Sequence, residues 1–299
     1  MFDYFKEMDV FNNIRYTDSD HSYLINGKKA ISGTTLIHQF ENVFDAEEVA
    51  NKVAQKKGVS AQELLNQWAL TNVIASVKGS LLHEYCELFY QKRVQELFDE
   101  DITERIVKNL KRIETYKPTD VEFKDNVEKC LETIKLYVHK TLPLIHVFLN
   151  SSNGKLIPIG SEIIIGDEEY LVCGTIDQLF YNATHNTLEI WDWKTNKEFK
   201  VKDSYNKKLK FPLEQYDDTH FYKYSIQLNL YKWILEKNTN LRVSKLWLLN
   251  FSETLADKNE QAVYYECLDL QDKIQPLLEF YKNKTEAKTK DLKGRKYDI

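Results

Sequence analysis

The sequence predicts an α/β (α+β) fold, in which a mixed β-sheet is flanked by helices and follows a helical N-terminal portion. Three observations support this prediction. Apolar residues recur at helical spacing through most of the first half of the chain. From Ile157 onward, short runs rich in β-branched and aromatic residues alternate with turn residues, as in antiparallel strands. Helical and strand-like segments then alternate, an order that places helices against a sheet.

The chain begins with strand-like stretches separated by turn residues. Arg15–Tyr16 and Ser22–Asn26 flank the turn-like Thr17–Asp20, so we expect a hairpin region. Helices follow it. Asp45 and Ser60 are each followed three residues later by Glu, a capping-box pattern that predicts two helix starts.

Two further helices are predicted in the first half of the chain. Gly79 is expected to separate the helix that begins at Ser60 from a helix over Leu81–Leu97. Apolar residues at helical spacing predict a long amphipathic helix from Val121 to about Phe148, which Pro143 should end or kink.

The second half reads as a core sheet with two helices. Predicted strands are Ile163–Ile165, Tyr170–Phe180, Leu188–Lys194, Val243–Asn250 and Val263–Cys267, and predicted helices are Tyr222–Glu236 and Gln271–Tyr281. We expect residues 1–150 to form an N-terminal hairpin and helical region and residues 151–299 the core sheet, joined in one compact unit.

The composition excludes several classes of protein. The 299 residues are 42% hydrophobic and 29% charged, which suits a soluble protein with a sizeable core. No apolar run approaches the roughly 18 residues of a membrane helix, and the mixed first ten residues do not read as a signal peptide. We therefore expect a cytoplasmic protein with no membrane partner. The four widely spaced cysteines fit neither a zinc site nor a disulfide framework, so we expect buried, reduced thiols.

The distribution of charge matters more than the net charge of −5. Asp192–Lys210 carries seven lysines against three acidic residues, and Lys282–Lys296 carries seven basic residues against two. Each could be a solvated loop or tail. Each could equally be a surface that binds phosphates.

The strand Leu188–Lys194 ends in a carboxylate and an amine. Side chains alternate along a strand, so Asp192 and Lys194 should share the face that Leu188 and Ile190 bury. A strand-end ion pair of little energetic weight is the simpler interpretation.

A second acidic residue, Asp177, follows the preceding apolar strand. A hairpin-length connection would bring it beside Asp192. Two carboxylates held close repel each other unless a cation lies between them. Oxygen ligands suit a hard divalent metal, so this pair is a candidate metal site.

Two helical stripes add candidate residues. His83 and Glu87 are four residues apart on one helix face, and Gly79 should let that helix approach another backbone closely. Lys223, Gln227 and Tyr231 share a stripe of the later helix. Taken alone, each stripe has an ordinary structural explanation, as polar positions of an amphipathic helix.

In chain order, these residues resemble the PD-(D/E)XK nuclease superfamily, in the RecB-like and lambda-exonuclease-like branch that includes phage and mitochondrial genome-maintenance exonucleases. The resemblance covers roughly Ile31–Leu249. Its matching residues are Gly79, His83, Glu87, Gly174, Asp177, Asp192, Trp193, Lys194, Gln227 and Tyr231, with Glu162 matching an acidic residue of the first core strand. It implies a restriction-endonuclease-like fold. Unlike many members of this branch, the chain has no proline before Asp177. It also has no closely spaced cysteines after Tyr231, so we expect no iron–sulfur cluster.

The resemblance implies a role for each residue. His83, Asp177, Asp192 and the Trp193 carbonyl would bind Mg²⁺ or Mn²⁺, which activates a water and polarises a phosphate. Lys194 would orient that water or neutralise developing charge. Glu162 or Glu87 would hold a second metal or orient His83.

The implied substrate is DNA, either single-stranded or with ends, and exposed aromatic residues such as Trp193 or Tyr205 could stack on its unpaired bases. Gln227 and Tyr231 would position its backbone or brace the site, and a group of lysines would contact its phosphates. These are Lys197, Lys200, Lys207, Lys208, Lys210 and Lys223. A single-strand-binding or recombination protein is a conceivable partner, and the residue usage is compatible with a phage gene acting in a host cytoplasm.

Three functions are compatible with these residues. A divalent-metal-dependent exonuclease that processes DNA ends in recombination, repair or replication is favoured, because the branch is rich in such enzymes. A structure-specific or restriction-type endonuclease is the second. An inactive nuclease-fold protein that binds DNA or assembles with others is the third, and the intact Asp177, Asp192 and Lys194 argue against it.

Overall fold

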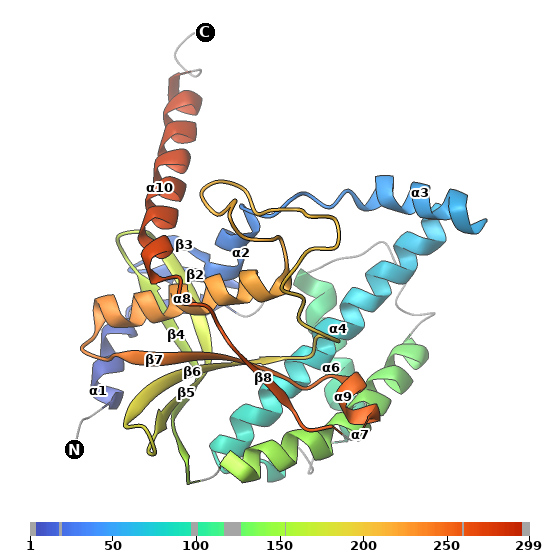
Figure 1. The fold of residues 1–299 in the computed structure, drawn as a ribbon, viewed down its shortest axis with the longest axis horizontal. Coiled ribbons are helices and arrows are strands. Elements are labelled where there is room, and N and C mark those ends of the chain that lie inside the picture. Colours follow the sequence, from blue (N-terminus) through green and yellow to red (C-terminus); the bar gives the residue numbers. More distant parts are fainter. Residues whose placement is uncertain are drawn as a thin grey trace.

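The computed structural model describes residues 4–17, 20–96, 101–116, 127–152, 154–258 and 260–294. Over these residues the chain forms an eight-stranded mixed sheet flanked by helices (Figure 1). The predicted α/β fold is therefore confirmed. Among the helices in these ranges, none has both the length and the apolar character needed to cross a membrane. All four cysteines are buried free thiols, as expected.

The N-terminal segment contributes three short antiparallel strands to one end of the sheet. Its elements are α1 (Tyr4–Met8), the 3₁₀ helix η1 (Asp9–Phe11), β1 (Ile14–Thr17), β2 (Ser22–Ile25), β3 (Lys28–Ser32) and α2 (Gly33–His38). The predicted hairpin is confirmed, although two residues of its turn lie outside the described ranges. β3 and α2 were not predicted, since elements of five or six residues are too short to show a clear periodicity.

The helical portion consists of α3 (Ala46–Lys57), α4 (Ala61–Tyr90), α6 (Ile102–Tyr116) and α7 (Val127–Ser152). The predicted cap at Asp45 is confirmed, because its side chain accepts a hydrogen bond from the Glu48 N–H at 2.8 Å. A helix does begin directly after Ser60, although the Ser60 side chain makes no capping bond.

Two predicted helix boundaries are wrong. α4 runs through Gly79 without interruption, so the two helices expected there are one. α7 continues nine residues beyond Pro143 to Ser152, because Leu144 and Leu149 are buried and their packing outweighs the backbone hydrogen bond that proline cannot make. The predicted residues 121–126 of this helix, and Leu97 of the earlier one, lie outside the described residues.

The core sheet is built from the predicted strands. Its remaining elements are β4 (Leu156–Asp167), β5 (Val172–Asn182), β6 (Thr187–Lys194), α8 (His220–Asn238), β7 (Val243–Asn250), α9 (Glu253–Asp257), β8 (Val263–Glu266) and α10 (Gln271–Gly294). Most strand ends differ from the prediction by a few residues, and β4 begins well before the predicted Ile163. The strand order is β1-β2-β3-β5-β6-β7-β8, with β4 on the other edge of β5. β6 and β7 are parallel, as are β3 and β5, which makes the sheet mixed.

β6 separates two hydrophobic cores. Its alternation predicted a buried face for Leu188 and Ile190, but Trp193 on the opposite face is only 1% exposed and so is not the exposed stacking residue expected from the sequence. Leu188 and Ile190 belong to the larger core, which includes α8. Trp191 and Trp193 belong to a second core formed with α4 and α7. Figure 1 shows α8 lying across the sheet, with α4, α6 and α7 grouped on the other side of β6. The end of β6 therefore lies between two helices that can both contribute side chains.

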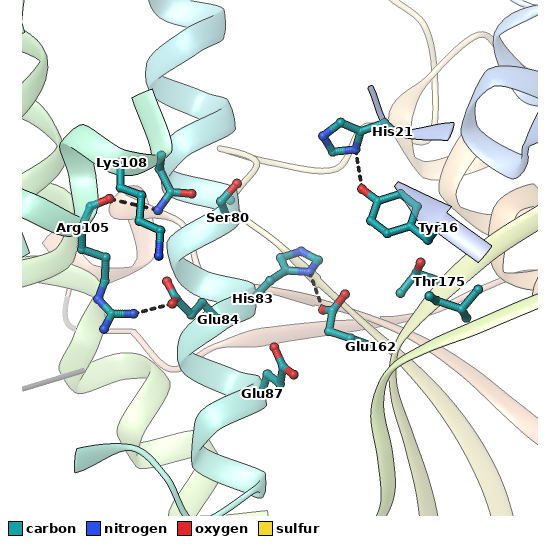
Figure 2. A pocket seen from close by; sticks show the side chains of 13 residues that line it. Tyr16, His21, Ser80, His83, Glu84, Glu87, Arg105, Lys108, Glu162 and Thr175 are labelled. Atoms are coloured by element: carbon teal, nitrogen blue, oxygen red, sulfur yellow. Dashed lines mark hydrogen bonds and ion pairs between the residues drawn. The ribbon is translucent and has the colours of Figure 1, made fainter. Parts of the chain in front are cut away.

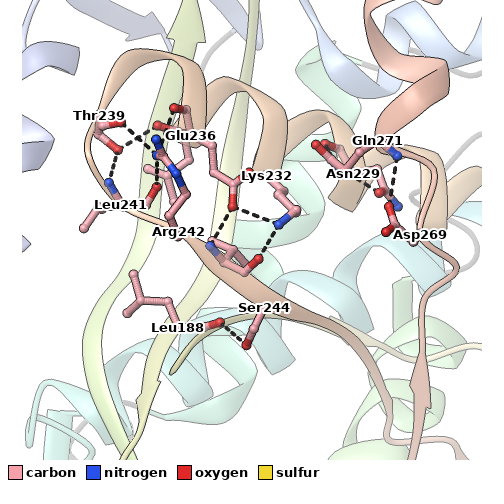
Figure 3. Close-up of polar contacts among 12 residues, drawn as sticks. Leu188, Asn229, Lys232, Glu236, Thr239, Leu241, Arg242, Ser244, Asp269 and Gln271 are labelled. Atoms are coloured by element: carbon pink, nitrogen blue, oxygen red, sulfur yellow. Dashed lines mark hydrogen bonds and ion pairs between the residues drawn. The ribbon is translucent and has the colours of Figure 1, made fainter. Parts of the chain in front are cut away.

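Buried polar contacts hold α8 in place (Figure 3). Asn229 is fully buried, and its amide donates to the Ser225 and Leu268 carbonyls at 2.7 Å. Its side-chain oxygen accepts hydrogen bonds from the Leu270 N–H and the Gln271 amide, each at 2.9 Å. Asn229 thus joins α8 to the start of α10. Because α8 borders the end of β6, this joint also fixes one wall of the candidate site.

We predict that Asn229→Ala destabilises the fold by about 1–3 kcal/mol, since it leaves buried backbone groups without partners. Urea unfolding measures the change. Asn150→Ala is the matched control, because Asn150 is exposed and its amide bonds the His146 carbonyl one turn earlier. Equal losses for the two variants would contradict the prediction.

Candidate metal centre

Three carboxylates lie in one row across the central strands β4, β5 and β6. The antiparallel register of β4 and β5 sets Glu162 opposite Asp177. The register of β5 and β6, continued one residue beyond the pair Gln178–Trp191, sets Asp177 opposite Asp192. Pairing alone therefore brings together three acidic groups that are far apart in the sequence.

Glu162 has an unusual backbone conformation. Its φ of 49° lies in the left-handed region, which a non-glycine residue occupies at a cost of about 1–3 kcal/mol. The surrounding structure must hold this conformation. The Glu162 carboxylate accepts a hydrogen bond from His83 Nδ1 at 3.2 Å, and Figure 2 shows the two side chains facing each other from β4 and α4.

His83 connects α4 to the end of the sheet. Its Nε2 lies 3.2 Å from the Trp193 carbonyl oxygen and 3.6 Å from Asp177 Oδ2. A carbonyl and a carboxylate only accept hydrogen bonds, so the imidazole satisfies both nitrogens when it is protonated. Burial lowers the pKa of His83, but the charges of Asp177 and Glu162 outweigh it and raise the pKa to about 9.

The carboxylates also perturb each other. Burial and the charge of Asp177 raise the pKa of Asp192 to about 7, and burial raises the pKa of Asp177. Two contacts offset this: Asp192 forms an ion pair with Lys194, and Asp177 accepts a hydrogen bond from the Trp193 N–H at 2.8 Å. Lys194 is itself largely buried, and the two carboxylates raise its pKa despite burial.

This donor set fits a divalent cation. One ligand atom from each of His83, Glu162 and Asp177 lies within 4.8 Å of the other two. Carboxylate oxygens suit Mg²⁺ and Mn²⁺, and a cation would relieve the repulsion that raises the carboxylate pKa values. Asp192 stands next in the row, but its carboxylate is turned to Lys194 and is not part of this three-residue group.

The site lies where β5 loses its neighbour on one edge. On that edge β3 pairs with Val172 and Cys173, and β6 pairs from Gln178 onward. Tyr231 of α8 occupies the gap: a Cβ added to Gly174 would lie 2.1 Å from its ring. The Tyr231 hydroxyl accepts a hydrogen bond from the Gln227 amide at 2.9 Å. Glycine at 174 is therefore required by a close approach of a side chain.

Two cavities meet at the site, and both are lined by Gly79 and His83. The first, of about 630 Å³, lies among α4, α6, β4 and the N-terminal strands (Figure 2). The second, of about 920 Å³, lies between α4 and the segment after β6, and includes Trp193, Lys194 and Lys197. Glu162 lines the first cavity, Lys194 lines the second, and His83 connects the two.

A comparison with family models decides the relationship of this chain. The model of the PD-(D/E)XK nuclease superfamily matches residues 59–295, which include the whole acidic row, His83 and Lys194. The chain belongs to the PD-(D/E)XK nuclease superfamily. A search of the curated proteins gave no match. Members of this superfamily are metal-dependent nucleases, so the donor set and the family agree.

Of the residues expected to bind metal, the fold brings His83, Asp177 and the Trp193 carbonyl together and sets Asp192, paired with Lys194, next to them. Glu87 was expected to hold a second metal or to orient His83, but its observed contact is with another residue. It lines the first cavity, but its carboxylate accepts a hydrogen bond from Gln91 one turn later. The carboxylate that contacts His83 belongs to Glu162, because β4 approaches this face of α4.

Three residues of α8 were predicted to contact DNA, and for Tyr231 and Gln227 the packing supports the other predicted role, bracing of the site. Tyr231 is only 4% exposed and is packed against Gly174, so it cannot reach a phosphate and instead braces the gap in the sheet. Gln227 bonds Tyr231 and shares this bracing. Lys223 is half-buried and forms ion pairs with Glu41 and Asp218, which compete with a phosphate.

The lysines predicted to contact DNA from the loop after β6 are all exposed, but only some of them line a cavity at the site. Lys197 lines the second cavity, and Lys197 and Lys200 line an adjoining cavity of about 450 Å³. Lys207, Lys208 and Lys210 line neither, and Lys208 is paired with Asp217. The tail beyond residue 294 lies outside the described residues.

Several residues of the cavities were not found from the sequence. Arg105 and Lys108 line the first cavity from α6, a helix that was not predicted. His220 and Tyr224 line the second from α8. The sequence pattern could have identified His220 and Tyr224. They precede Gln227 and Tyr231 at helical spacing, so all four share one helix face.

Two glycine substitutions test this description of the site. Gly174→Ala should destabilise the chain by about 1–3 kcal/mol, because the new methyl overlaps the Tyr231 ring. At Gly79, by contrast, an added Cβ meets nothing within 4 Å, so the close approach expected there is absent, and Gly79→Ala should stabilise α4 by about 0.5–1 kcal/mol. Denaturant unfolding of both variants measures the difference. A tolerated Gly174→Ala would contradict the packing of Tyr231.

Proposed function

We propose that the protein is a divalent-metal-dependent DNA nuclease that processes DNA ends. The observation that carries this proposal is the row Glu162, Asp177 and Asp192, which meets the His83 imidazole and the Lys194 ammonium at the junction of two cavities. A fold needs no such concentration of buried charge for stability, and buried charges cost free energy unless they are paired.

His83, Asp177 and Asp192 would hold Mg²⁺ or Mn²⁺, with Glu162 as a further ligand or as the group that orients His83. When bound, such a metal lowers the pKa of a coordinated water and polarises a phosphate. Glu162 is well placed to orient the imidazole, since it already bonds the nitrogen that faces away from Asp177.

Lys194 would act on the phosphate or on the attacking water. Its ammonium is held by Asp192 and lies 4.6 Å from the centre of the Tyr224 ring, so its position is set before substrate arrives. A positioned cation stabilises negative charge that develops on a phosphate without further reorganisation. Lys197 and Lys200, in the loop after β6, would bind the phosphates on either side of the cleaved one.

The preference for ends is supported by the resemblance to the branch described above. Internal cleavage by a structure-specific or restriction-type enzyme is the alternative activity. An inactive nuclease-fold protein is the alternative of another class, and the complete set of acidic residues with Lys194 argues against it.

Metal binding can be tested without a substrate. We expect Mg²⁺ or Mn²⁺ to raise the melting temperature of the wild type, since a ligand at 100 times its dissociation constant adds about 2.7 kcal/mol of stability. Asp177→Asn should abolish this increase. Glu87→Gln is the matched control and should keep the increase, because the Glu87 carboxylate bonds Gln91 and not His83. An equal shift in wild type and Asp177→Asn would contradict the proposed ligand.

Cleavage can be tested on end-labelled linear DNA and on closed circular DNA, with Mg²⁺, Mn²⁺ or EDTA. We expect linear DNA to be degraded only with metal, and Lys194→Ala to lower kcat by about 10²–10³-fold. Lys245→Ala is the control, since Lys245 is exposed and pairs with Glu266 on the far side of β7. Cutting of the closed circle would favour the endonuclease, and no cutting of either DNA would favour the inactive protein.

A further inference from the structure

The second cavity contains an aromatic pair that the acidic row does not use. The His220 and Tyr224 rings, one turn apart at the start of α8, are stacked with centroids 5.7 Å apart and planes inclined by 20°. Both rings line the cavity that also holds His83, Trp193 and Lys194. An aromatic surface therefore begins beside the site proposed for catalysis.

Tyr224 is held firmly. Its hydroxyl donates a hydrogen bond to Asn196 at 3.4 Å, and its ring packs edge-on against Phe199 with centroids 5.9 Å apart. The Lys194 ammonium lies 4.6 Å from the ring centre. Contacts with the loop after β6 and with Lys194 thus fix the ring on which His220 rests.

His220 is the exposed member of the pair. Although the residue is exposed, partial burial of its imidazole and the nearby Lys223 lower the pKa of His220, which favours the uncharged ring. His220 is the first residue of α8, after Thr219 in an extended conformation, and it lines the cavity.

The remaining walls suit a nucleobase with its phosphates. α4 contributes mostly small or apolar residues between Ala69 and Ser76. Three lysines also line the cavity: Lys78 is paired with Glu253, a carboxylate of the same cavity, Lys194 is paired with Asp192, and Lys197 is exposed. The volume of about 920 Å³ is within the range of about 300–1,000 Å³ that encloses a small ligand.

We propose that His220, supported by Tyr224, is a stacking platform for an unpaired base next to the scissile phosphate, so that the enzyme acts on single-stranded DNA or on a frayed end. This inference rests on the proposed nuclease function, since the platform is located by the contact of Tyr224 with Lys194 and by the cavity that both rings share with Lys194. A base can stack on a protein ring only when it has left its neighbours in the duplex, which makes the platform selective for unpaired DNA.

Binding in EDTA tests the platform without cleavage. The probes are a fluorescent deoxythymidine oligonucleotide, the same oligonucleotide with abasic sites throughout, and a duplex of equal length, followed by fluorescence anisotropy. We expect His220→Ala to weaken binding of the deoxythymidine strand by about 5- to 150-fold, the range for loss of one stacked base. Binding of the abasic strand and of the duplex should be unchanged.

His220→Phe should retain wild-type affinity for the deoxythymidine strand, because it keeps a flat ring without the imidazole nitrogens. His185→Ala is the matched control, since His185 is exposed in the β5–β6 turn, at the end of β6 opposite Lys194. Equal weakening for deoxythymidine and abasic strands, or a His220→Phe variant as weak as His220→Ala, would overturn the stacking role.

The two proposals fail in different ways. If the wild type does not cut DNA with Mn²⁺ but His220→Ala still loses base-dependent binding, the nuclease function is wrong and the platform stands. If the wild type cuts DNA but its affinity does not depend on bases or on His220, the platform is wrong and the nuclease function stands.

Discussion

The repulsion among three neighbouring carboxylates is the constraint around which this structure is arranged. Glu162, Asp177 and Asp192 meet because strand pairing sets them opposite one another. In a largely buried location such a row is unfavourable unless positive charge balances it. His83 from α4 and Lys194 from β6 provide that charge. In the proposed function a divalent cation would balance the carboxylates instead. His83 would then bind that cation and Lys194 would act on the phosphate, so the same residues have a structural role and a proposed catalytic one.

The gap in the sheet makes this arrangement possible. Where β3 has ended and β6 has not yet paired with β5, the Trp193 N–H is free to bond the Asp177 carboxylate. Tyr231 fills the same gap beside Gly174, and so keeps it from collapsing. One side of α8 therefore has two roles. Gln227 and Tyr231 support the sheet, and His220 and Tyr224 line the second cavity.

Much of the core could be predicted from the sequence, because its signals are local. β7 was predicted with its observed boundaries, and β6 within one residue. The alternation along β6 put Leu188 and Ile190 on the face that the larger core buries, but it did not show that the opposite face, with Trp191 and Trp193, is buried as well. Helix boundaries that depend on packing were wrong: neither Gly79 nor Pro143 ends its helix, because each lies within a long helix whose buried residues continue on both sides.

The sequence by itself determined which chemical groups are present and on which elements they lie, since residue identity and the periods of strands and helices are local properties. It also indicated that Asp177 and Asp192 would be neighbours, because a short hairpin joins their strands. Only the tertiary structure decided that Glu162 and not Glu87 contacts His83, that Tyr231 is buried, and that His220 faces the site. These outcomes depend on how β4, α4 and α8 pack against one another across long sequence separations, and no local pattern encodes such distances.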